Sequence, residues 1–224
     1  MRLDRGGDLV ESDLVNVVLL SIFVSTTATL LASAIGIPLG SIMGLRSFRG
    51  KEILRTVTYT LYGFPPVVAG LLVYMMVSSG GPLGSLGILF TPAAMILAQM
   101  VLVFPIVTGL TMSAVSEVAG DVKDTAMTLG ADDWQTAITV MSEARIGIVS
   151  AIMVGFGRAI AEVGAVMIVG GNIKWHTRVL TTSIVLETRR GNFEYAMALG
   201  VVLLAVAMMV FYVLKRYQDG GVRA

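Results

Sequence analysis

Two long stretches of this sequence contain no charged side chain. The first runs from Leu14 to Leu45, and the second covers the 61 residues from Thr56 to Ser116. A helix needs about 20 apolar residues to cross a bilayer, and charge is costly in hydrocarbon. Only 14% of the 224 residues are charged, against about 25% in a typical soluble domain. The sequence therefore predicts an all-α integral membrane protein.

The composition also excludes several kinds of chemistry. Cysteine is absent and His176 is the single histidine, which excludes disulfides, iron–sulfur clusters and a multi-histidine metal site within one chain. The net charge of +1 argues against a nucleic-acid partner. The glycine-rich stretch 80–87 lacks the Lys-Ser/Thr pair of a phosphate loop. No catalytic residue, cofactor site or metal site is therefore predicted in this chain.

Polar segments divide the apolar sequence into five predicted membrane spans within a single domain, residues 1–224. The segment 46–55 holds four bases and one acid, which places it in the cytoplasm because Lys and Arg are in excess on the inner side. The N-terminus is then outside and the C-terminus inside. A short apolar segment predicts a half-helix at the outer face, at about 176–190. The predicted spans are about 14–45, 56–77, 88–115, 146–171 and 195–214.

Small residues recur at every fourth position of the first predicted span, at Ala32, Gly36, Gly40 and Gly44. This spacing forms a ridge that lets another helix backbone approach closely. The approaching helix belongs either to the same subunit or to a second one.

The second predicted span is interrupted by two consecutive prolines, Pro65 and Pro66, with Phe64 beside them. A broken helix at membrane depth occurs where protein or a water-filled cavity covers the freed backbone groups. The break therefore predicts either a kinked packing helix or a segment that lines a transport pathway.

Arg158 and Glu162 are the charges placed deep within a predicted span. They are four residues apart, so on one helix they would face the same side. Three interpretations remain open. The two residues form a structural ion pair, Arg158 contacts an anion, or Glu162 relays protons.

The segment 117–145 is the longest polar insertion, with six acids and two bases. It is rich in helix-forming residues, and Gly130 divides it into two predicted short helices. Asp132 or Asp133 is placed to cap the second helix. The segment therefore predicts a polar helix-turn-helix on the cytoplasmic face.

This segment resembles the coupling motif of ABC-transporter permease subunits, E-A-A-x3-G-x9-I-x-L-P. The match consists of Asp124, Thr125 and Ala126, followed by Gly130 at the expected offset. The closing I-x-L-P of the family falls on Val140, Ser142 and Glu143 here, and only the valine is a conservative match. The motif residues implied by the resemblance are Asp124, Thr125, Ala126, Gly130 and Val140.

Further segments resemble the permeases for molybdate and tungstate. They are G-F-P-P at 63–66, G-P-L-G-x-L-G-I-x-F-T at 81–91 and G-F-G-R-A-I-A-E-V-G-A-V-M-I-V-G-G-N at 155–172. The last of these, with the following T-R-V-L-T-T, is most similar to tungstate permeases. The candidate pathway or gate residues come from the proline break and from these segments; they are Phe64, Pro65, Pro66, Asn172, Thr181 and Thr182.

The resemblance implies an ATP-driven importer with five spans per chain. Two permease chains would pair in the cell membrane and enclose one pathway. Separate ATPase subunits would bind ATP and Mg on the inner face, and an extracytoplasmic binding protein would deliver an oxyanion, tungstate or alternatively molybdate. Two other classes stay open: a proton-coupled secondary carrier that uses Glu162, and an intramembrane enzyme or structural subunit.

Overall fold

The computed structural model describes the backbone of residues 5–220 and the side chains of residues 13–216 and 218. Residues 1–4 and 221–224, which hold part of the predicted outer N-terminus and inner C-terminus, lie outside the described residues. Between residues 5 and 220 all regular structure is helical and no strand occurs. The predicted all-α class is confirmed.

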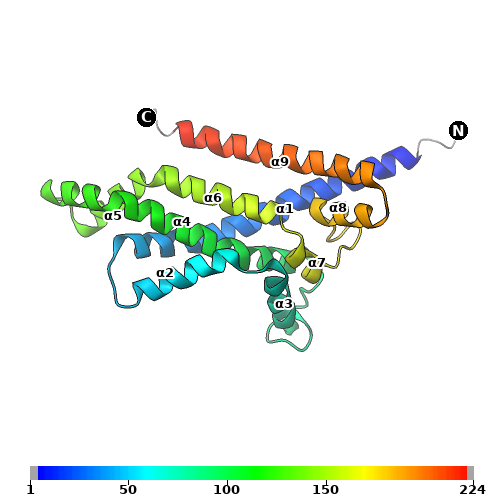
Figure 1. Ribbon diagram of the computed structural model, residues 1–224, viewed down its shortest axis with the longest axis horizontal. Helices are drawn as coiled ribbons and strands as arrows, with labels where there is room; N and C mark the ends of the chain where they lie inside the picture. Colours follow the sequence, from blue (N-terminus) through cyan, green and yellow to red (C-terminus); the bar gives the residue numbers. More distant parts are fainter. Residues whose placement is uncertain (1–4, 221–224) are drawn as a thin grey trace. The chain divides into compact units, whose positions relative to one another are not determined.

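Nine α-helices are described, and Figure 1 labels them along the chain. Two short 3-10 helices, η1 (Leu61–Gly63) and η2 (Gly84–Leu86), lie between them. The α-helices are α1 (Arg5–Leu45), α2 (Lys51–Thr60), α3 (Pro66–Val77), α4 (Pro92–Thr128), α5 (Asp133–Glu143), α6 (Arg145–Ile160), α7 (Gly164–Gly170), α8 (Leu180–Arg189) and α9 (Phe193–Gly220).

The chain forms two compact units, and each of them combines segments that are distant in the sequence. Unit 1 contains Met1–Ala28, Pro65–Gln99 and Ala159–Phe211. Unit 2 contains Thr29–Phe64, Met100–Arg158 and Tyr212–Ala224.

Three helices are each long and apolar enough to cross a membrane: Asp13–Leu45 within α1, Pro92–Thr128, and Phe193–Arg216 within α9. Two further pairs of consecutive helices, each bent at a short break, are long and apolar enough to cross a membrane when the two helices are counted as one span. They are Lys51–Gly63 with Pro66–Val77, bent by 102°, and Asp133–Glu143 with Arg145–Ile160, bent by 59°. Counting each pair as one crossing gives up to five, and the predicted five-span topology stays a prediction.

Helix α4 does not end where the third span was predicted to end, at residue 115. It continues unbroken to Thr128, so the first half of the polar segment is the end of a long helix rather than a separate short one. Between Pro105 and Thr128 the sequence offers no further proline, and the isolated Gly109 and Gly120 weaken a helix by only about 1 kcal/mol each. The change from apolar to polar residues after Ser116 therefore does not mark a helix end.

The predicted fourth span, 146–171, is interrupted at residues 161–163. Helix α6 ends at Ile160, and the side chain of Glu162 turns to the next helix, where its Oε1 accepts a hydrogen bond from Ala165 N at 2.9 Å. This bond satisfies a backbone donor at the start of α7. Arg158 and Glu162 therefore do not lie on one continuous helix, contrary to the prediction from their spacing.

In unit 1, α3 and α7 pack against each other and are neighbours in Figure 1. A Cβ built on Gly70 would lie 2.7 Å from the Cα of Ala165, so only glycine permits this approach. Helix α8 is fixed to α1 because Leu180 N donates a hydrogen bond of 2.8 Å to Ser21 Oγ. Val17, Leu180 and Leu199 form the buried core of these elements.

In unit 2, the glycine ridge of α1 packs against α4. A Cβ on Gly36, Gly40 or Gly44 would meet atoms of α4, including Thr108 and Val115, at 3.0 Å or less. The ridge therefore packs within one subunit, which was the first of the two predicted alternatives.

We expect Gly40→Ala to destabilise the protein, because the new Cβ would lie within 2.3 Å of the Thr108 carbonyl oxygen. That oxygen belongs to a helix backbone and cannot move away without displacing α4. Overpacking of this kind costs about 1–3 kcal/mol. Thermal unfolding of the purified variant should give a lower Tm. Gly200→Ala in α9, where the Cβ meets nothing within 4 Å, is the control, and equal Tm values for both variants would contradict the packing argument.

Candidate functional site

The polar segment forms a helical hairpin in unit 2, built from the end of α4, a turn at residues 129–132, and α5. Gly130 has φ +86° and open space around its Cβ position, so its role is conformational. Gly130 N donates to Met127 O and Ala131 N donates to Ala126 O, both at 3.0 Å. These two bonds are the Schellman pattern that terminates a helix with a left-handed residue. The predicted turn at Gly130 is confirmed.

The second helix of the hairpin begins with a reciprocal cap. Asp132 Oδ1 accepts a hydrogen bond from Gln135 N at 2.8 Å, and Gln135 Oε1 accepts one from Asp132 N at 3.0 Å. Such a capping box satisfies two backbone donors that a helix start would otherwise leave free. Of the two predicted caps, Asp132 holds the position, and Asp133 is the first residue of α5.

A groove of about 400 Å³ lies between the two helices of the hairpin. Ala126, which is 8% exposed, lines it together with Thr125 and Leu129. Leu129 and Trp134 are 83% and 73% exposed, although they belong to an acidic and otherwise polar segment. Leu129 at the groove and Trp134 near the start of α5 therefore present apolar surface in a segment that is otherwise polar.

The five predicted coupling residues occupy four kinds of position. Asp124 and Thr125 are exposed on α4, and Ala126 and Gly130 form the groove wall and the turn. Val140 is fully buried and packs in a core with Val115 and Ala144. Val140 therefore supports the hairpin from inside and has no surface for a partner.

The proline break separates α2 and η1 from α3. Phe64 and Pro65 are both extended, and Pro66 is the first residue of α3. Proline is suited to this first position because its missing N–H has no helical partner there. The predicted break is confirmed, and the pathway role of these three residues stays a prediction.

Glu162 is buried, with 3% of its surface exposed. Besides the bond from Ala165 N, its backbone carbonyl accepts a hydrogen bond of 2.8 Å from Thr181 Oγ1. Glu162 thus ties the start of α7 to α8, and Thr181 is a structural contact in this chain. Arg158 is half-buried in α6, and its pairing with Glu162 stays a prediction.

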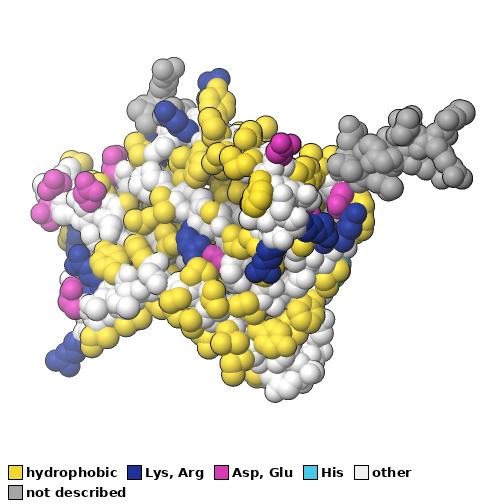
Figure 2. All heavy atoms as spheres, turned by 45° about the vertical axis from the view of Figure 1, so that its right-hand side comes forward, with side chains coloured by type: hydrophobic (Ala, Val, Ile, Leu, Met, Phe, Trp, Pro, Cys, Tyr) yellow, Lys and Arg dark blue, Asp and Glu magenta, His cyan; other side chains and the backbone are white. Residues whose placement is uncertain are grey.

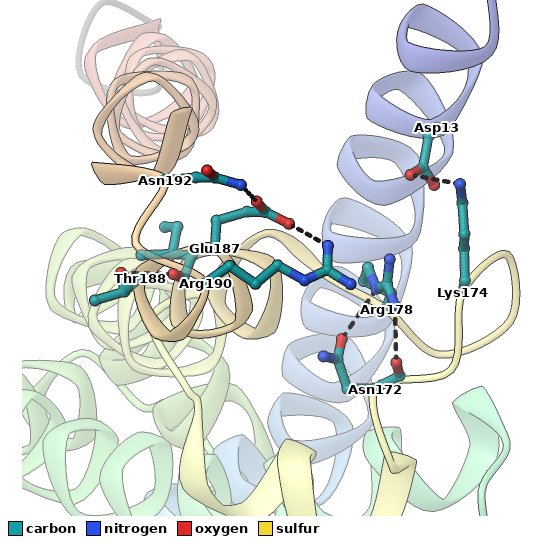
Figure 3. Close-up of polar contacts among 9 residues, drawn as sticks. Asp13, Asn172, Lys174, Arg178, Glu187, Thr188, Arg190 and Asn192 are labelled. Carbon is teal, nitrogen blue, oxygen red and sulfur yellow. Dashed lines mark hydrogen bonds and ion pairs between the residues drawn. The ribbon is translucent and has the colours of Figure 1, made fainter. Parts of the chain in front are cut away.

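An ordered loop precedes α8, and it shortens the half-helix that was predicted to begin at about 176. Asn172 has φ +51° and accepts two hydrogen bonds from Arg178, one to Oδ1 at 3.3 Å and one to the backbone oxygen at 3.4 Å (Figure 3). Thr182 is fully buried, and its Oγ1 accepts from Val179 N at 3.1 Å. These bonds hold residues 172–179 outside the helix, which starts at Leu180.

The end of α8 carries a polar network that the sequence did not reveal. Glu187, which is 8% exposed, accepts hydrogen bonds of 2.8 Å from Arg190 and from Asn192 Nδ2. In the same unit Lys174 Nζ lies 3.4 Å from Asp13 Oδ2, so the loop is tied to α1 (Figure 3). The sequence signals for the network are the spacing of three residues between Glu187 and Arg190 and the Gly-Asn pair that follows the helix.

Hydrophobic side chains cover much of the face drawn in Figure 2. Helix α9 contributes strongly to such surface, because Met197 and Met208 are 72% and 71% exposed. Large exposed apolar surface on long apolar helices suits contact with lipid or with another membrane subunit.

The fold and the hairpin define a class, namely a multi-pass helical membrane protein with a polar helical hairpin. Residues 36–224 match the model of the family described as "Binding-protein-dependent transport system inner membrane component". The chain belongs to this family.

Three named relatives are similar to this chain over most of its length. A probable anion ABC transporter permease protein of Haloferax volcanii is 44% identical over 95% of this chain and 94% of its own length. The tungstate uptake system permease protein TupB of Peptoclostridium acidaminophilum is 44% identical over 91% and 89%. The protein of the same name from Campylobacter jejuni is 37% identical over 74% and 70%.

Proposed function

We propose that this chain is the membrane permease subunit of an ATP-driven importer for an oxyanion, and that the anion is tungstate. The hairpin of α4 and α5 carries the proposal, because its capped helix, left-handed glycine and apolar-rimmed groove suit a rigid protein contact. The names of the relatives with 37–44% identity support the choice of tungstate. Molybdate is the alternative anion within the same group.

The proposal includes the assembly around the chain. Two copies pair in the cell membrane, with the N-terminus outside and the C-terminus in the cytoplasm. The exposed apolar surface of the long helices is suited to such pairing as well as to lipid. ATP and Mg bind to separate ATPase subunits that dock on the hairpin, and an extracytoplasmic binding protein delivers the anion.

We expect uptake to require ATP and the ATPase subunit, and to be independent of a proton gradient. The experiment uses proteoliposomes that contain the permease and its ATPase, with the binding protein added outside and ATP enclosed. Tungstate accumulation is measured before and after a protonophore collapses the gradient. Loss of uptake with ATP still present would replace the importer with a proton-coupled carrier.

Competition between anions for uptake tests the choice of tungstate. In the same proteoliposomes we expect unlabelled tungstate to compete with labelled tungstate at lower concentration than molybdate or sulfate does. Stronger competition by molybdate would assign the system to molybdate and leave the importer class unchanged.

A further inference from the structure

Unit 2 contains a second and larger groove, between α2 and the middle of α4, with a volume of about 790 Å³. We call it the basic groove. Its volume lies in the range of small-molecule binding sites, about 300–1,000 Å³. The side chains that carry the argument are Lys51, Arg55 and Tyr59 from α2 and Ser113, Ser116 and Glu117 from α4.

The basic groove is formed by two polar stripes. Lys51, Arg55 and Tyr59 are spaced by four residues and share one face of α2, and Ser113 and Ser116 are neighbours on one face of α4. Tyr59 and Ser113 meet, with a hydrogen bond of 2.9 Å between their hydroxyl oxygens. Hydrogen-bond donors therefore lie on both sides of the groove. The rest of the lining includes the carboxylates of Glu52 and Glu117 and the apolar side chains of Phe48, Ile53 and Met112.

Arg55 and the hydroxyl pair of Tyr59 and Ser113 still have hydrogen-bond donors that a ligand can use. The guanidinium of Arg55 lies 5.6 Å from the centre of the Tyr59 ring and 3.9 Å from Glu52 Oε1. A guanidinium carries five N–H donors, so one long contact and one ring contact use few of them. The bond between Tyr59 and Ser113 uses one hydroxyl proton, and the second hydroxyl proton of the pair is free to donate elsewhere.

The charge of the groove indicates how strongly an anion would bind. Lys51 and Arg55 are balanced by Glu52 and Glu117 among the lining residues. A balanced lining with many donors holds an anion by hydrogen bonds but without a large net attraction. Weak binding is what a transport pathway requires, because the ion must also leave.

We propose that the basic groove binds a tetrahedral oxyanion on the cytoplasmic side of the membrane. This inference rests on the importer function proposed above, and it names a place where the transported anion is held before release. Arg55 supplies paired N–H donors, Lys51 supplies a second positive charge, and the hydroxyls of Tyr59 and Ser113 complete the site. The phosphate of an anionic lipid headgroup has the same chemistry, so the experiment separates the two sources.

The experiment uses the permease with its ATPase in nanodiscs of neutral phosphatidylcholine, without the binding protein or nucleotide. Tungstate binding is measured by equilibrium dialysis for the wild type, Arg55→Gln, Tyr59→Phe and Arg49→Gln. We expect Arg55→Gln to weaken tungstate binding about tenfold or more, since it removes charge-assisted hydrogen bonds. Tyr59→Phe should weaken it less. Arg49 belongs to the same basic segment but does not line the groove, so Arg49→Gln is expected to bind as the wild type does.

In a parallel preparation, mass spectrometry is used to measure how much phosphatidylglycerol the purified complex retains. If tungstate does not bind but phosphatidylglycerol is retained by the wild type and lost from Arg55→Gln, the oxyanion is a lipid phosphate. If both ligands bind equally to the wild type and Arg55→Gln, the basic groove is not an oxyanion site. Failure of the importer function would appear separately, as ATP hydrolysis in proteoliposomes without tungstate accumulation.

Discussion

Ala126→Arg is expected to abolish tungstate uptake while the permease still inserts and pairs. Ala126 lies in the groove of the hairpin and is 8% exposed, so an arginine side chain would fill the space that a partner needs. The hairpin core of Val115, Val140 and Ala144 does not include Ala126, and the membrane helices should therefore fold normally. We expect the variant to lose co-purification of the ATPase and tungstate-stimulated ATP hydrolysis.

Gly130→Leu should also abolish tungstate uptake and co-purification of the ATPase, but through a different cause. No atom lies within 4 Å of its Cβ position, so the leucine meets no clash within this chain. Its left-handed backbone, with φ +86°, is instead unfavourable for leucine by about 1–2 kcal/mol. The turn should shift and move Ala126 and α5 relative to each other, which alters the docking groove without removing it.

The control for both variants is Gly120→Arg. Gly120 is exposed on the same helix with nothing within 4 Å of its Cβ position, and it lies roughly 120° around the helix axis from Ala126. This variant should retain the ATPase and transport. Wild-type co-purification with Ala126→Arg and Gly130→Leu would refute the docking role of the hairpin.

The continuity of α4 suggests how docking acts on the membrane part. A single helix runs from Pro92 to Thr128, so the groove wall that includes Ala126 belongs to the same helix as the apolar segment. We infer that movement of the hairpin is carried along α4 as a rigid-body displacement, as in other domain rearrangements. A break between the third span, predicted to end at residue 115, and a separate short helix would have absorbed part of that movement.

Local signals in the sequence predicted much of the fold. Pro65 and Pro66 break a helix because of their own geometry, Gly130 adopts a conformation that other residues avoid, and Asp132 caps a helix start through a local bond. Such effects depend on a few neighbouring residues and can therefore be read from them. The interruption after Ile160 has no such signal, because it depends on the buried position of Glu162 and on its bond to Thr181.

The candidate sites in the hairpin and in the basic groove depend partly on tertiary contacts, and the sequence therefore predicted them only in part. The motif includes Ala126 and Gly130, which lie in the groove wall and in the turn, and it also includes Val140, whose burial results from packing against α4. The basic groove joins residues that are 54 positions apart, Tyr59 and Ser113. A contact of that sequence separation follows from the tertiary arrangement of α2 and α4, and neither helix alone indicates it.

Arg158→Ala is expected to reduce the folded yield strongly, if Arg158 and Glu162 form the predicted ion pair. The substitution would leave the buried carboxylate of Glu162 without its charge partner, which typically costs about 3–5 kcal/mol. Adding Glu162→Gln should recover part of the yield, because the amide oxygen still accepts the hydrogen bond from Ala165 N that starts α7. Glu162→Ala in place of the glutamine should recover less, since it leaves that backbone donor without a partner at a cost of about 1–3 kcal/mol.

These differences are measured as the yield of monodisperse protein and as its Tm. The interaction energy between Arg158 and Glu162 is the difference between the effect of the double variant and the sum of the effects of the two single variants.

Transport measurements then separate the three interpretations of the two residues. An ATP-driven importer with a structural pair should retain tungstate uptake in the Arg158→Ala, Glu162→Gln double variant, because neither side chain then has a chemical role. Normal folding of Arg158→Ala with no uptake would instead assign Arg158 to the anion. Loss of uptake in a well-folded Glu162→Gln variant, together with dependence on the proton gradient, would establish Glu162 as a proton site.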